Sequence, residues 1–441
     1  MSVHLALRPG DRGQTIEGFG ASGAWWAQVV GGWPDETRTR IMELLYSKTK
    51  GLGMTTYRYN LGGGSKESGR GNIGNPNRRA SSFLREDGGY DWGRDAQAVW
   101  CMEEAVRQGA DDIILFVNSP PERWTVSGAA HCKTPLRSNL LRAHERDFVG
   151  YVLDVAEHFA GQGVPVISVS PINEPQWIWT GGQEGCHYKP WNLRRVFSLL
   201  AQEMEKRPAL RDVKISGPEC GDLRFFNKTY IRAMMRDPQV RRRLAGIDTH
   251  SYRVFQPQLF PGAAARYRRW ASRKYPGVPL HVSEWTHMRG PRDYGMDSAL
   301  EQCRVMMQDL GVLGVVSWQH WVAVSEVDYA DGLIYIDEEA RTFDIPKRYY
   351  AFGNFTKFVP RGSVRVGIEC SAPRLEAIAF RTPEGKTVVI LRNPREEEQV
   401  SLGQNGGAVL HVTDDTRDLA PVPVALEGFA LPGRSVCTLI F

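Results

Sequence analysis

The stretch "ISVSPINEPQW" (residues 167–177) joins an apolar, β-branched run to Asn173, Glu174 and Pro175. Its first half is typical of a buried β-strand, because β-branched side chains pack well on a pleated surface. A carboxylate at the end of such a strand is costly unless it is paired or reaches water. Glu174 must therefore have a partner, contact with solvent or a chemical task, and the rest of the chain decides among these.

The strand before Glu174 is one of eight that alternate with helical segments, at the spacing of roughly 30–50 residues that βα units show. Amphipathic helices are predicted at 35–47, 92–108, 144–162 and 298–312. Eight alternating units predict a (β/α)8 barrel over residues 16–350. The predicted strands are "TIEGFGAS" (15–22), "TTYRYNLG" (55–62), "DIILFVNS" (112–119), "VISVSPIN" (166–173), "KISGPE" (214–219), "GIDTHSY" (246–252), "LHVSEW" (280–285) and "GVVSWQHW" (314–321).

An open, doubly wound sheet is the alternative arrangement for this pattern. Its nucleotide-binding forms carry a glycine-rich turn after the first strand. "GFGASG" (18–23) matches G-x-G-x-x-G in spelling, but no acidic residue ends a second strand about 20 residues later. "LGGGSKES" (61–68) lacks the spacing of a P-loop. We interpret both as bends of the backbone, which disfavours a nucleotide-dependent enzyme.

The pattern changes after residue 350. Short alternating strands such as "KTVVILRN" and "SVCTLIF" follow one another with Gly, Pro and Asn at the turns, which predicts a β-sandwich over residues 351–441. The segment "VHLALRPG" (3–10) is one more strand, placed before the barrel begins. We expect residues 1–15 to join the sandwich and to make that domain discontinuous.

Composition excludes several classes of protein. The 441 residues are 42% hydrophobic and 24% charged, with a formal net charge of only +5 and dispersed basic residues, so a nucleic-acid partner is not expected. No stretch of about 18 apolar residues predicts a membrane span. The N-terminus as given has no apolar leader. We expect a monomer without a membrane partner, in the cytoplasm as the sequence stands and secreted if a leader has been removed.

Seven cysteines, an odd and scattered set, favour free thiols in a reducing compartment over a disulfide framework. "AHC" (130–132) and "GCH" (185–187) are mirror-image pairs of Cys and His. They would form a disulfide or a two-Cys, two-His metal site if their loops met. Neither has the usual spacing of metal ligands, so we expect unpaired loop residues.

Polar and aromatic residues follow the ends of the predicted strands. In a barrel of this kind the carboxyl ends of the strands gather at one rim, where active sites lie. Each residue alone has an ordinary structural explanation, but a structural rim does not need two carboxylates among stacked aromatic rings. The candidates are Trp25, Trp26, Arg58, Asn118, Trp124, Asn173, Glu174, His250, Tyr252, Glu284, Trp318 and Trp321.

Two carboxylates that face each other across a pocket suit glycoside hydrolysis, in which one protonates the leaving oxygen and the other attacks or supports the sugar. Aromatic faces suit the apolar faces of sugars, and Asn and Arg bond hydroxyl groups. This chemistry requires no metal and no organic cofactor. A non-catalytic carbohydrate-binding protein is the alternative, although it would not need both Glu174 and Glu284.

The motifs also resemble a known family. Strand 4 ending in "NEP" and strand 7 ending in "SEW" resemble the retaining (β/α)8 glycoside hydrolases. "IEGFGASGAWWA" (16–27), "NSPPERW" (118–124) and a sandwich built from both chain ends resemble glycoside hydrolase family 30. The resemblance covers essentially the whole chain.

This resemblance implies a role for each candidate. Glu174 would be the general acid/base and Glu284 the nucleophile. Asn173 would bond the sugar 2-hydroxyl, and Tyr252 would contact the nucleophile. Arg58 would lie beneath Glu284 and lower its pKa, and the sugar platform would consist of Trp124, Trp318 and Trp321.

Two loops carry the information on substrate. "GAWWAQVVGGW" (23–33) and "HWVAVSEVDYADGLIY" (320–335) most resemble the β-1,6-galactanase branch of the family. β-1,6-Glucanase, xylanase, β-xylosidase, β-fucosidase and glucosylceramidase activities also occur in the family. The sequence therefore predicts a carbohydrate substrate, with β-1,6-galactan as the first choice, and leaves endo or exo action open.

Overall fold

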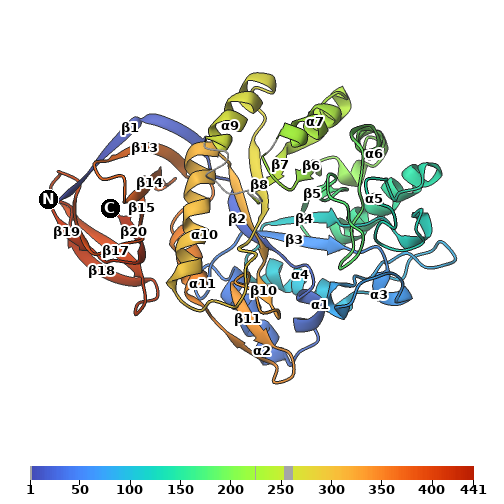
Figure 1. The fold of residues 1–441 in the computed structure, drawn as a ribbon, viewed down its shortest axis with the longest axis horizontal. Coiled ribbons are helices and arrows are strands. Elements are labelled where there is room, and N and C mark those ends of the chain that lie inside the picture. Colours follow the sequence, from blue (N-terminus) through green and yellow to red (C-terminus); the bar gives the residue numbers. More distant parts are fainter. Residues whose placement is uncertain (1, 224, 253–261) are drawn as a thin grey trace.

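The barrel is closed by eight parallel strands (Figure 1). A computed structural model describes residues 2–223, 225–252 and 262–441. Pairing of the first strand with the last closes the ring, because Gly18 lies opposite Ser317 and Gly20 opposite Gln319. The predicted barrel is confirmed, and the open sheet is excluded. The strands are β2 (Gly18–Ser22), β3 (Thr56–Leu61), β4 (Asp112–Val117), β5 (Val166–Ser170), β6 (Lys214–Cys220), β7 (Leu244–His250), β8 (Leu280–Trp285) and β9 (Ser317–Val322).

The barrel strands are buried on both faces, because side chains fill the interior and helices cover the outside. Every residue of β4, β8 and β9 is buried. In α5 (Glu145–Gly161) Phe148, Val152, Val155 and Phe159 recur at helical spacing and face the barrel. The longer covering helices are α2 (Asp35–Tyr46), α4 (Ala96–Gln108), α6 (Pro190–Met204), α7 (Phe225–Met234), α9 (Ala263–Lys274) and α10 (Met296–Gln308).

Short helices and strands lie in the loops that connect the barrel strands and the covering helices. They are α1 (Ala27–Val30), α3 (Ser65–Ser68), α8 (Pro238–Arg243), single helical turns at Pro76–Arg78, Glu122–Trp124, Arg142–His144, Pro208–Leu210 and Asp309–Leu313, and the three-stranded sheet of β10 (Val324–Ser325), β11 (Ile334–Asp337) and β12 (Thr342–Asp344). This small sheet extends the loop after β9, which the sequence singled out for substrate choice.

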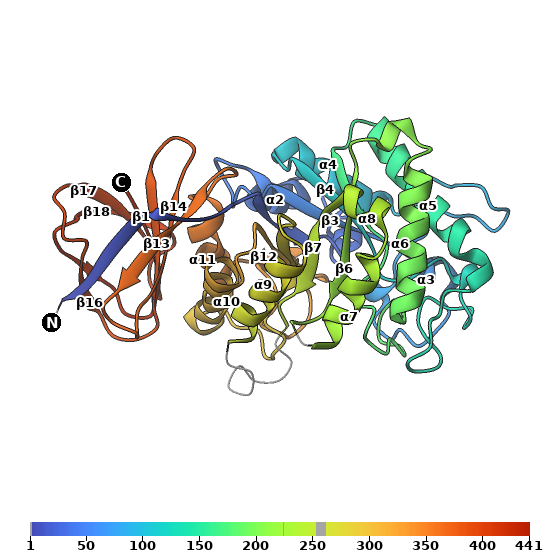
Figure 2. The ribbon, with the colours of Figure 1, turned by 90° about the horizontal axis from the view of Figure 1, so that it is seen from above.

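Both chain ends lie in the second domain (Figures 1 and 2). Strand β1 (Val3–Thr15) pairs antiparallel with β13 (Val364–Cys370) and parallel with β16 (Glu398–Ser401). Strand β18 (Ala420–Ala425) alternates between half-buried and exposed positions. Leu5, Leu391 and Leu439 belong to a core separate from that of the barrel. The other strands are β14 (Glu376–Arg381), β15 (Thr387–Asn393), β17 (Gly407–Thr413), β19 (Phe429–Leu431) and β20 (Ser435–Ile440).

The chain passes from barrel to sandwich through α11 (Lys347–Thr356), which contains the expected division at residue 350. Asn354 of this helix is fully buried and donates to Thr438 Oγ1 at 3.0 Å and to the carbonyl of His411 at 3.1 Å. Arg392 of the sandwich donates to the carbonyl of Leu300 in α10 at 2.8 Å. We propose that the sandwich domain begins after α11, because this helix also bonds to the barrel, where Tyr349 Oη donates to the carbonyl of Leu44 at 2.7 Å.

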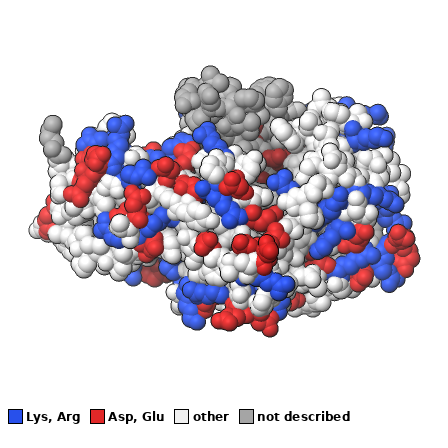
Figure 3. All heavy atoms as spheres, turned by 60° about the horizontal axis from the view of Figure 1, so that its bottom comes forward, with Lys and Arg blue, Asp and Glu red and all other residues white. Residues whose placement is uncertain are grey.

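The face shown in Figure 3 has no large patch of like charge, because Lys and Arg are interspersed with Asp and Glu. Among the described residues, no helix combines the length and the apolarity that a membrane crossing requires.

Candidate active site

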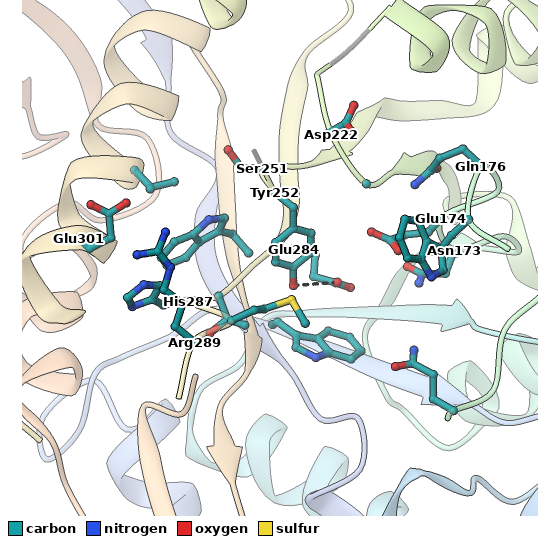
Figure 4. Close-up of a pocket in the computed structure, with 18 of the residues that line it drawn as sticks. Asn173, Glu174, Gln176, Asp222, Ser251, Tyr252, Glu284, His287, Arg289 and Glu301 are labelled. Atoms are coloured by element: carbon teal, nitrogen blue, oxygen red, sulfur yellow. Dashed lines mark hydrogen bonds between the residues drawn. The ribbon is translucent and has the colours of Figure 1, made fainter. Parts of the chain in front are cut away.

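A cavity of about 1170 Å³ opens at the carboxyl ends of the barrel strands. Glu284 and Tyr252 lie near its middle, Asn173, Glu174 and Gln176 on one side, and His287, Arg289 and Glu301 on the other (Figure 4). The barrel thus brings together residues that are more than a hundred positions apart in the sequence. Its further lining residues are Trp25, Trp177, Trp179, Gln183, Gly221, Asp222, Ser251, Trp285, Thr286, Met288, Arg304, Val305 and Trp321.

The two candidate carboxylates face each other. One oxygen of Glu174 and one of Glu284 lie within 4.8 Å of each other, and a ring nitrogen of His250 lies within the same distance of both. Carboxyl groups about 5–5.5 Å apart are typical of retaining glycosidases, whereas inverting enzymes leave about 6.5–9.5 Å for a water molecule. The spacing matches the retaining geometry.

His250 is the hub of the polar network below the cavity. Its Nδ1 lies 3.0 Å from Glu174 Oε1 and 3.4 Å from Glu284 Oε1. Its Nε2 lies 3.1 Å from Glu219 Oε2. Burial acts to lower the pKa of His250, but the carboxylates of Glu284, Glu174 and Glu219 outweigh it and raise the pKa to about 10. The imidazole is therefore protonated on both nitrogens at neutral pH.

Glu219 completes this network from the end of β6. It is fully buried, and Ser283 Oγ also donates to its Oε2. Burial acts to raise its pKa, but Arg58, His250 and Ser283 together hold the pKa at about 2. The ionised Glu219 thus fixes the ring of His250 and partly balances the charge of Arg58, whose Nη2 lies 3.5 Å away.

The three residues Glu174, His250 and Glu284 also have the residue types of a metal site. A histidine binds a metal through the lone pair of a neutral imidazole nitrogen. His250 has a raised pKa, and each of its nitrogens lies against a carboxylate. The donor set therefore fits a network of charged hydrogen bonds better than a metal centre.

Glu284 is held by two donors. Arg58 Nη1 donates to Oε2 at 3.0 Å. Tyr252 Oη donates to Oε1 at 3.1 Å, the bond drawn in Figure 4. The sequence predicted that Arg58 would lower the pKa of Glu284. Arg58 and His250 do act in that direction, but burial outweighs them and the pKa of Glu284 is raised. The effect predicted for Arg58 is therefore present, but the burial that outweighs it cannot be inferred from the place of Glu284 at a strand end.

Glu174 is less enclosed, with 15% of its side chain exposed to the cavity. Its backbone has φ = 39°, and its amide N–H donates to the carbonyl of Glu219 at 3.0 Å. Positive φ also occurs at Trp25, Trp179 and Glu219, a conformation that costs a non-glycine residue roughly 1–2 kcal/mol. Backbone strain is thus concentrated at this site, where it directs side chains toward or beneath the cavity.

Gly221 leaves room for the carboxylate of Glu174. A Cβ atom at this position would lie 2.4 Å from Glu174 Oε1 and 2.6 Å from Gln176 Nε2. The absence of a side chain therefore sets the position of Glu174.

Aromatic rings form the walls. Trp25 meets Trp321 edge to face at a centroid distance of 5.1 Å. Trp179 donates its indole N–H to the carbonyl of Glu174 at 3.0 Å. Trp177 is 49% exposed, which leaves a ring face free to receive an apolar surface. Such faces pack against the C–H surfaces of sugars.

The structure brings most predicted site residues together. Trp25, Asn173, Glu174, Tyr252, Glu284 and Trp321 line the cavity, whereas Arg58 and His250 lie directly below it. Arg58 also donates to Asn173 Oδ1 at 3.3 Å and lies over the ring of Phe116.

Four predicted residues do not line the cavity. Trp26 and Trp318 are fully buried, and their indole N–H groups bond to the carbonyl of Ser22 and to Asp309 Oδ2. Trp124 packs edge to face on Tyr151, and Asn118 donates to Asn60 Oδ1. These side chains pack in the core or hold neighbouring loops in place. They point away from the cavity because neighbouring positions in a strand point to opposite sides.

Sequence reasoning missed several residues of the site. Glu219 ends the strand "KISGPE", so its place at the rim was visible, but its pairing with His250 depends on the packing of β6 against β7. Trp177 follows Glu174 in "NEPQW" and could have been proposed as part of the wall. Gln176 lies in the loop after β5, Trp285 ends β8 and Arg289 lies in the loop after β8, and all three line the cavity.

Comparison with known proteins agrees with this geometry. The chain is 24% identical over 442 residues to the endo-β-1,6-galactanase of Hypocrea rufa, covering 92% of this chain and 86% of that protein. It is 24% identical to the lysosomal acid glucosylceramidase of Mus musculus, covering 68% of this chain and 60% of that protein. The structure of a conserved exported protein from Bacteroides fragilis superposes with a TM-score of 0.89 at 23% identity, covering 99% of this chain and 100% of that one.

Two family models account for both domains. The model of O-glycosyl hydrolase family 30 matches residues 2–335, and that of the glycosyl hydrolase family 30 β-sandwich domain matches residues 362–439. Retention of configuration is characteristic of this family, in agreement with the spacing of Glu174 and Glu284. The protein is therefore a member of glycoside hydrolase family 30 and a retaining glycosidase.

Proposed function

We propose that this protein is an endo-acting β-1,6-galactanase, with Glu284 as nucleophile and Glu174 as general acid/base. The observation that carries the proposal is the pair of facing carboxylates in a cavity that has lining residues on both sides of Glu284. The cavity volume exceeds the range of roughly 300–1,000 Å³ that is usual for drug-sized ligands, so several sugar units have room. A cavity with lining residues on both sides of the cleavage point can hold sugar units on either side, as attack within a chain requires.

The first chemical step uses the bonds around Glu284. Its carboxylate attacks the anomeric carbon while Glu174 gives a proton to the leaving oxygen, and a glycosyl ester forms. Arg58 and Tyr252 hold both oxygens of Glu284 and so fix the direction of attack. In the second step Glu174 takes a proton from water, and the water cleaves the ester.

Asn173 is proposed to bind the sugar next to the nucleophile. Its Oδ1 accepts from Arg58, which directs the amide nitrogen to the other side of the group, as a donor to a hydroxyl of the sugar. Trp321 and Trp25 would pack against the same sugar, and Trp177 would meet the sugar beyond the cleaved bond.

The choice of β-1,6-galactan is supported by the relative from Hypocrea rufa, which aligns over more of both chains than the glucosylceramidase does. The loops 23–33 and 320–335 point to the same branch. Both flank the cavity, since Trp25 and Trp321 come from them.

The test of substrate compares defined oligosaccharides. We expect kcat/KM on β-1,6-galactohexaose to exceed that on β-1,6-linked glucose, β-1,4-linked xylose and glucosylceramide by at least about 100-fold, since a site that bonds a hydroxyl rejects an analogue that misplaces it. The first products should be di- to tetrasaccharides. Equal rates on glucose oligomers would contradict the galactanase assignment, and release of galactose alone would contradict endo action.

Replacing His250 with Asn is expected to shift the pH profile of the enzyme. Glu284 must be ionised to attack, so kcat/KM falls as the pH drops through the pKa of Glu284. His250 is a cation that lowers this pKa. Without it the pKa of Glu284 rises, and the acidic limb of the kcat/KM profile should move to higher pH by about one unit.

The matched control is His281→Asn. His281 also has a pKa raised to about 10, but it lies at the other end of its strand, with Nδ1 2.8 Å from Asp248 Oδ1. Its replacement should leave the acidic limb in place. If both variants or neither moved that limb, His250 would not tune the nucleophile.

A further inference from the structure

Two cysteines outside the active site lie on loops that touch each other. Cys132 belongs to the loop between β4 and α5, and Cys186 to the loop between β5 and α6. The amide N–H of Cys132 donates to the carbonyl of Trp179 at 2.8 Å, and that of Gly185 donates to the carbonyl of Ala130 at 2.9 Å. These bonds place the segments 130–132 and 179–186 side by side.

The two thiols interact where these two segments lie side by side. Cys132 is 1% exposed and Cys186 is not exposed at all. The amide N–H of His187 donates to Cys132 Sγ at 3.3 Å. A hydrogen bond from the thiol of Cys186 lowers the pKa of Cys132, whereas burial raises the pKa of Cys186.

The neighbouring histidines do not make this a metal site. Asn72 donates its amide N–H to His131 Nε2 at 2.8 Å, and His187 Nδ1 lies 3.0 Å from the carbonyl of Trp177. Both imidazoles therefore have backbone partners. This argues against the two-Cys, two-His site considered from the sequence.

A polar neighbour of the thiol does not distinguish this pair, since Cys132 Sγ also lies 3.8 Å from the carbonyl of Arg137 and Cys186 Sγ 3.6 Å from that of His187. Among the described residues, Cys101, Cys220, Cys303 and Cys370 each direct the thiol to a backbone carbonyl, and Cys437 directs it to Ser435 Oγ. They lie on α4, β6, α10, β13 and β20. Only the pair Cys132 and Cys186 has thiols that interact with each other among the residues that the structure describes.

We propose that Cys132 and Cys186 form a disulfide when the protein matures in an oxidising environment, and that this bond ties the loop after β4 to the wall around Glu174. The segment that it closes contains β5, Glu174, Trp177 and Trp179. Trp179 and His187 bond to carbonyls in that wall, so the link lies directly behind it.

The oxidation is a thiol–disulfide exchange. One protein thiolate attacks a disulfide of the oxidant, either a low-molecular-weight disulfide or the disulfide of an oxidoreductase, and releases one thiol. The second protein thiolate then attacks the mixed disulfide and releases the other. Two protons and two electrons leave the protein, and the oxidant ends as two thiols. Because both sulfurs are buried in the fold, the exchange takes place before the loops close.

The test uses the full chain, made once in an oxidising secretory compartment and once in a reducing cytosol. Alkylation in denaturant should find five free thiols in the first preparation and seven in the second. Peptide mapping should join the fragments of Cys132 and Cys186. Seven free thiols in both preparations, or a link between other cysteines, would overturn the proposal.

Single-cysteine substitutions test which residues account for the change in the number of free thiols. Cys186→Ser should show six free thiols from both sources, whereas the control Cys303→Ser should show four and six. The oxidised wild type should also unfold at a temperature higher by roughly 3–5 °C than after reduction, since the bond closes a long loop. Cys186→Ser should lose this difference, and an equal response to reductant in Cys186→Ser would contradict the assignment.

Discussion

Replacement of Glu284 with Gln is expected to lower kcat by about 10⁵-fold or more on every substrate, including activated aryl glycosides. An amide cannot form the glycosyl ester, so the two-step route has no first intermediate. The change retains the size of the side chain and its position between Arg58 and Tyr252. The measurement is steady-state turnover, together with mass spectrometry for a glycosyl-enzyme trapped by a 2-fluoro sugar, which should label wild type but not the variant.

The control for this experiment is Glu369→Gln. Glu369 is an exposed carboxylate of the sandwich that pairs with Arg8. Its replacement should leave turnover and the melting temperature close to those of wild type. Residual activity of Glu284→Gln above about one thousandth of wild type, in a preparation free of wild-type enzyme, would mean that Glu284 is a structural ion-pair partner.

The barrel could be predicted because its strands and helices have recognisable sequence patterns at regular spacing. The eight predicted strands alternate with helical segments at the spacing of βα units, and all eight are barrel strands in the structure. The sandwich was predictable for a different reason, since its short strands follow one another with Gly, Pro and Asn at the turns and no helical segments between them. The sequence predicted that residues 1–15 join the sandwich, because they contain a strand before the barrel begins. The structure shows this in the pairing of Leu5 with Cys370.

Side-chain direction was much harder to predict. Trp25 and Trp26 are neighbours, yet Trp25 lines the cavity and Trp26 is fully buried. The difference arises from the backbone of Trp25, which has φ = 70°. No pattern of residue types signals such a conformation at a tryptophan. In the same way Trp318 and Trp321 share a strand, but only Trp321 faces the cavity.

Charge balance in the site also depends on packing between strands. A sequence can show that Arg58, Glu219, His250 and Glu284 all lie near strand ends. It cannot show that Glu219 pairs with His250 or that Glu284 is deep enough for burial to outweigh two cations. Distances of a few ångströms decide these signs, and they come from the register of β6, β7 and β8.

Replacement of Glu174 with Ala is expected to lower kcat/KM by an amount that depends on the leaving group of the substrate. A natural glycoside needs a proton on the departing oxygen, so its kcat/KM should fall by roughly 10³–10⁴-fold. An aryl glycoside with a highly acidic phenol needs no such proton, and its first step should slow by less than about 10-fold. The measurement is kcat/KM for a series of aryl β-glycosides, whose dependence on the pKa of the phenol should become steep only in the variant.

The second half of the mechanism gives the same variant an independent test. Without Glu174 no base activates water, so the glycosyl-enzyme on Glu284 should persist and limit turnover of activated substrates. Azide needs no base, and the missing side chain leaves it space beside the ester. Added azide should therefore raise turnover and yield a β-glycosyl azide, because two inversions restore the original configuration. An α-azide, or an α-anomer as the first product of the wild-type enzyme, would exclude an intermediate on Glu284 whatever the sugar is.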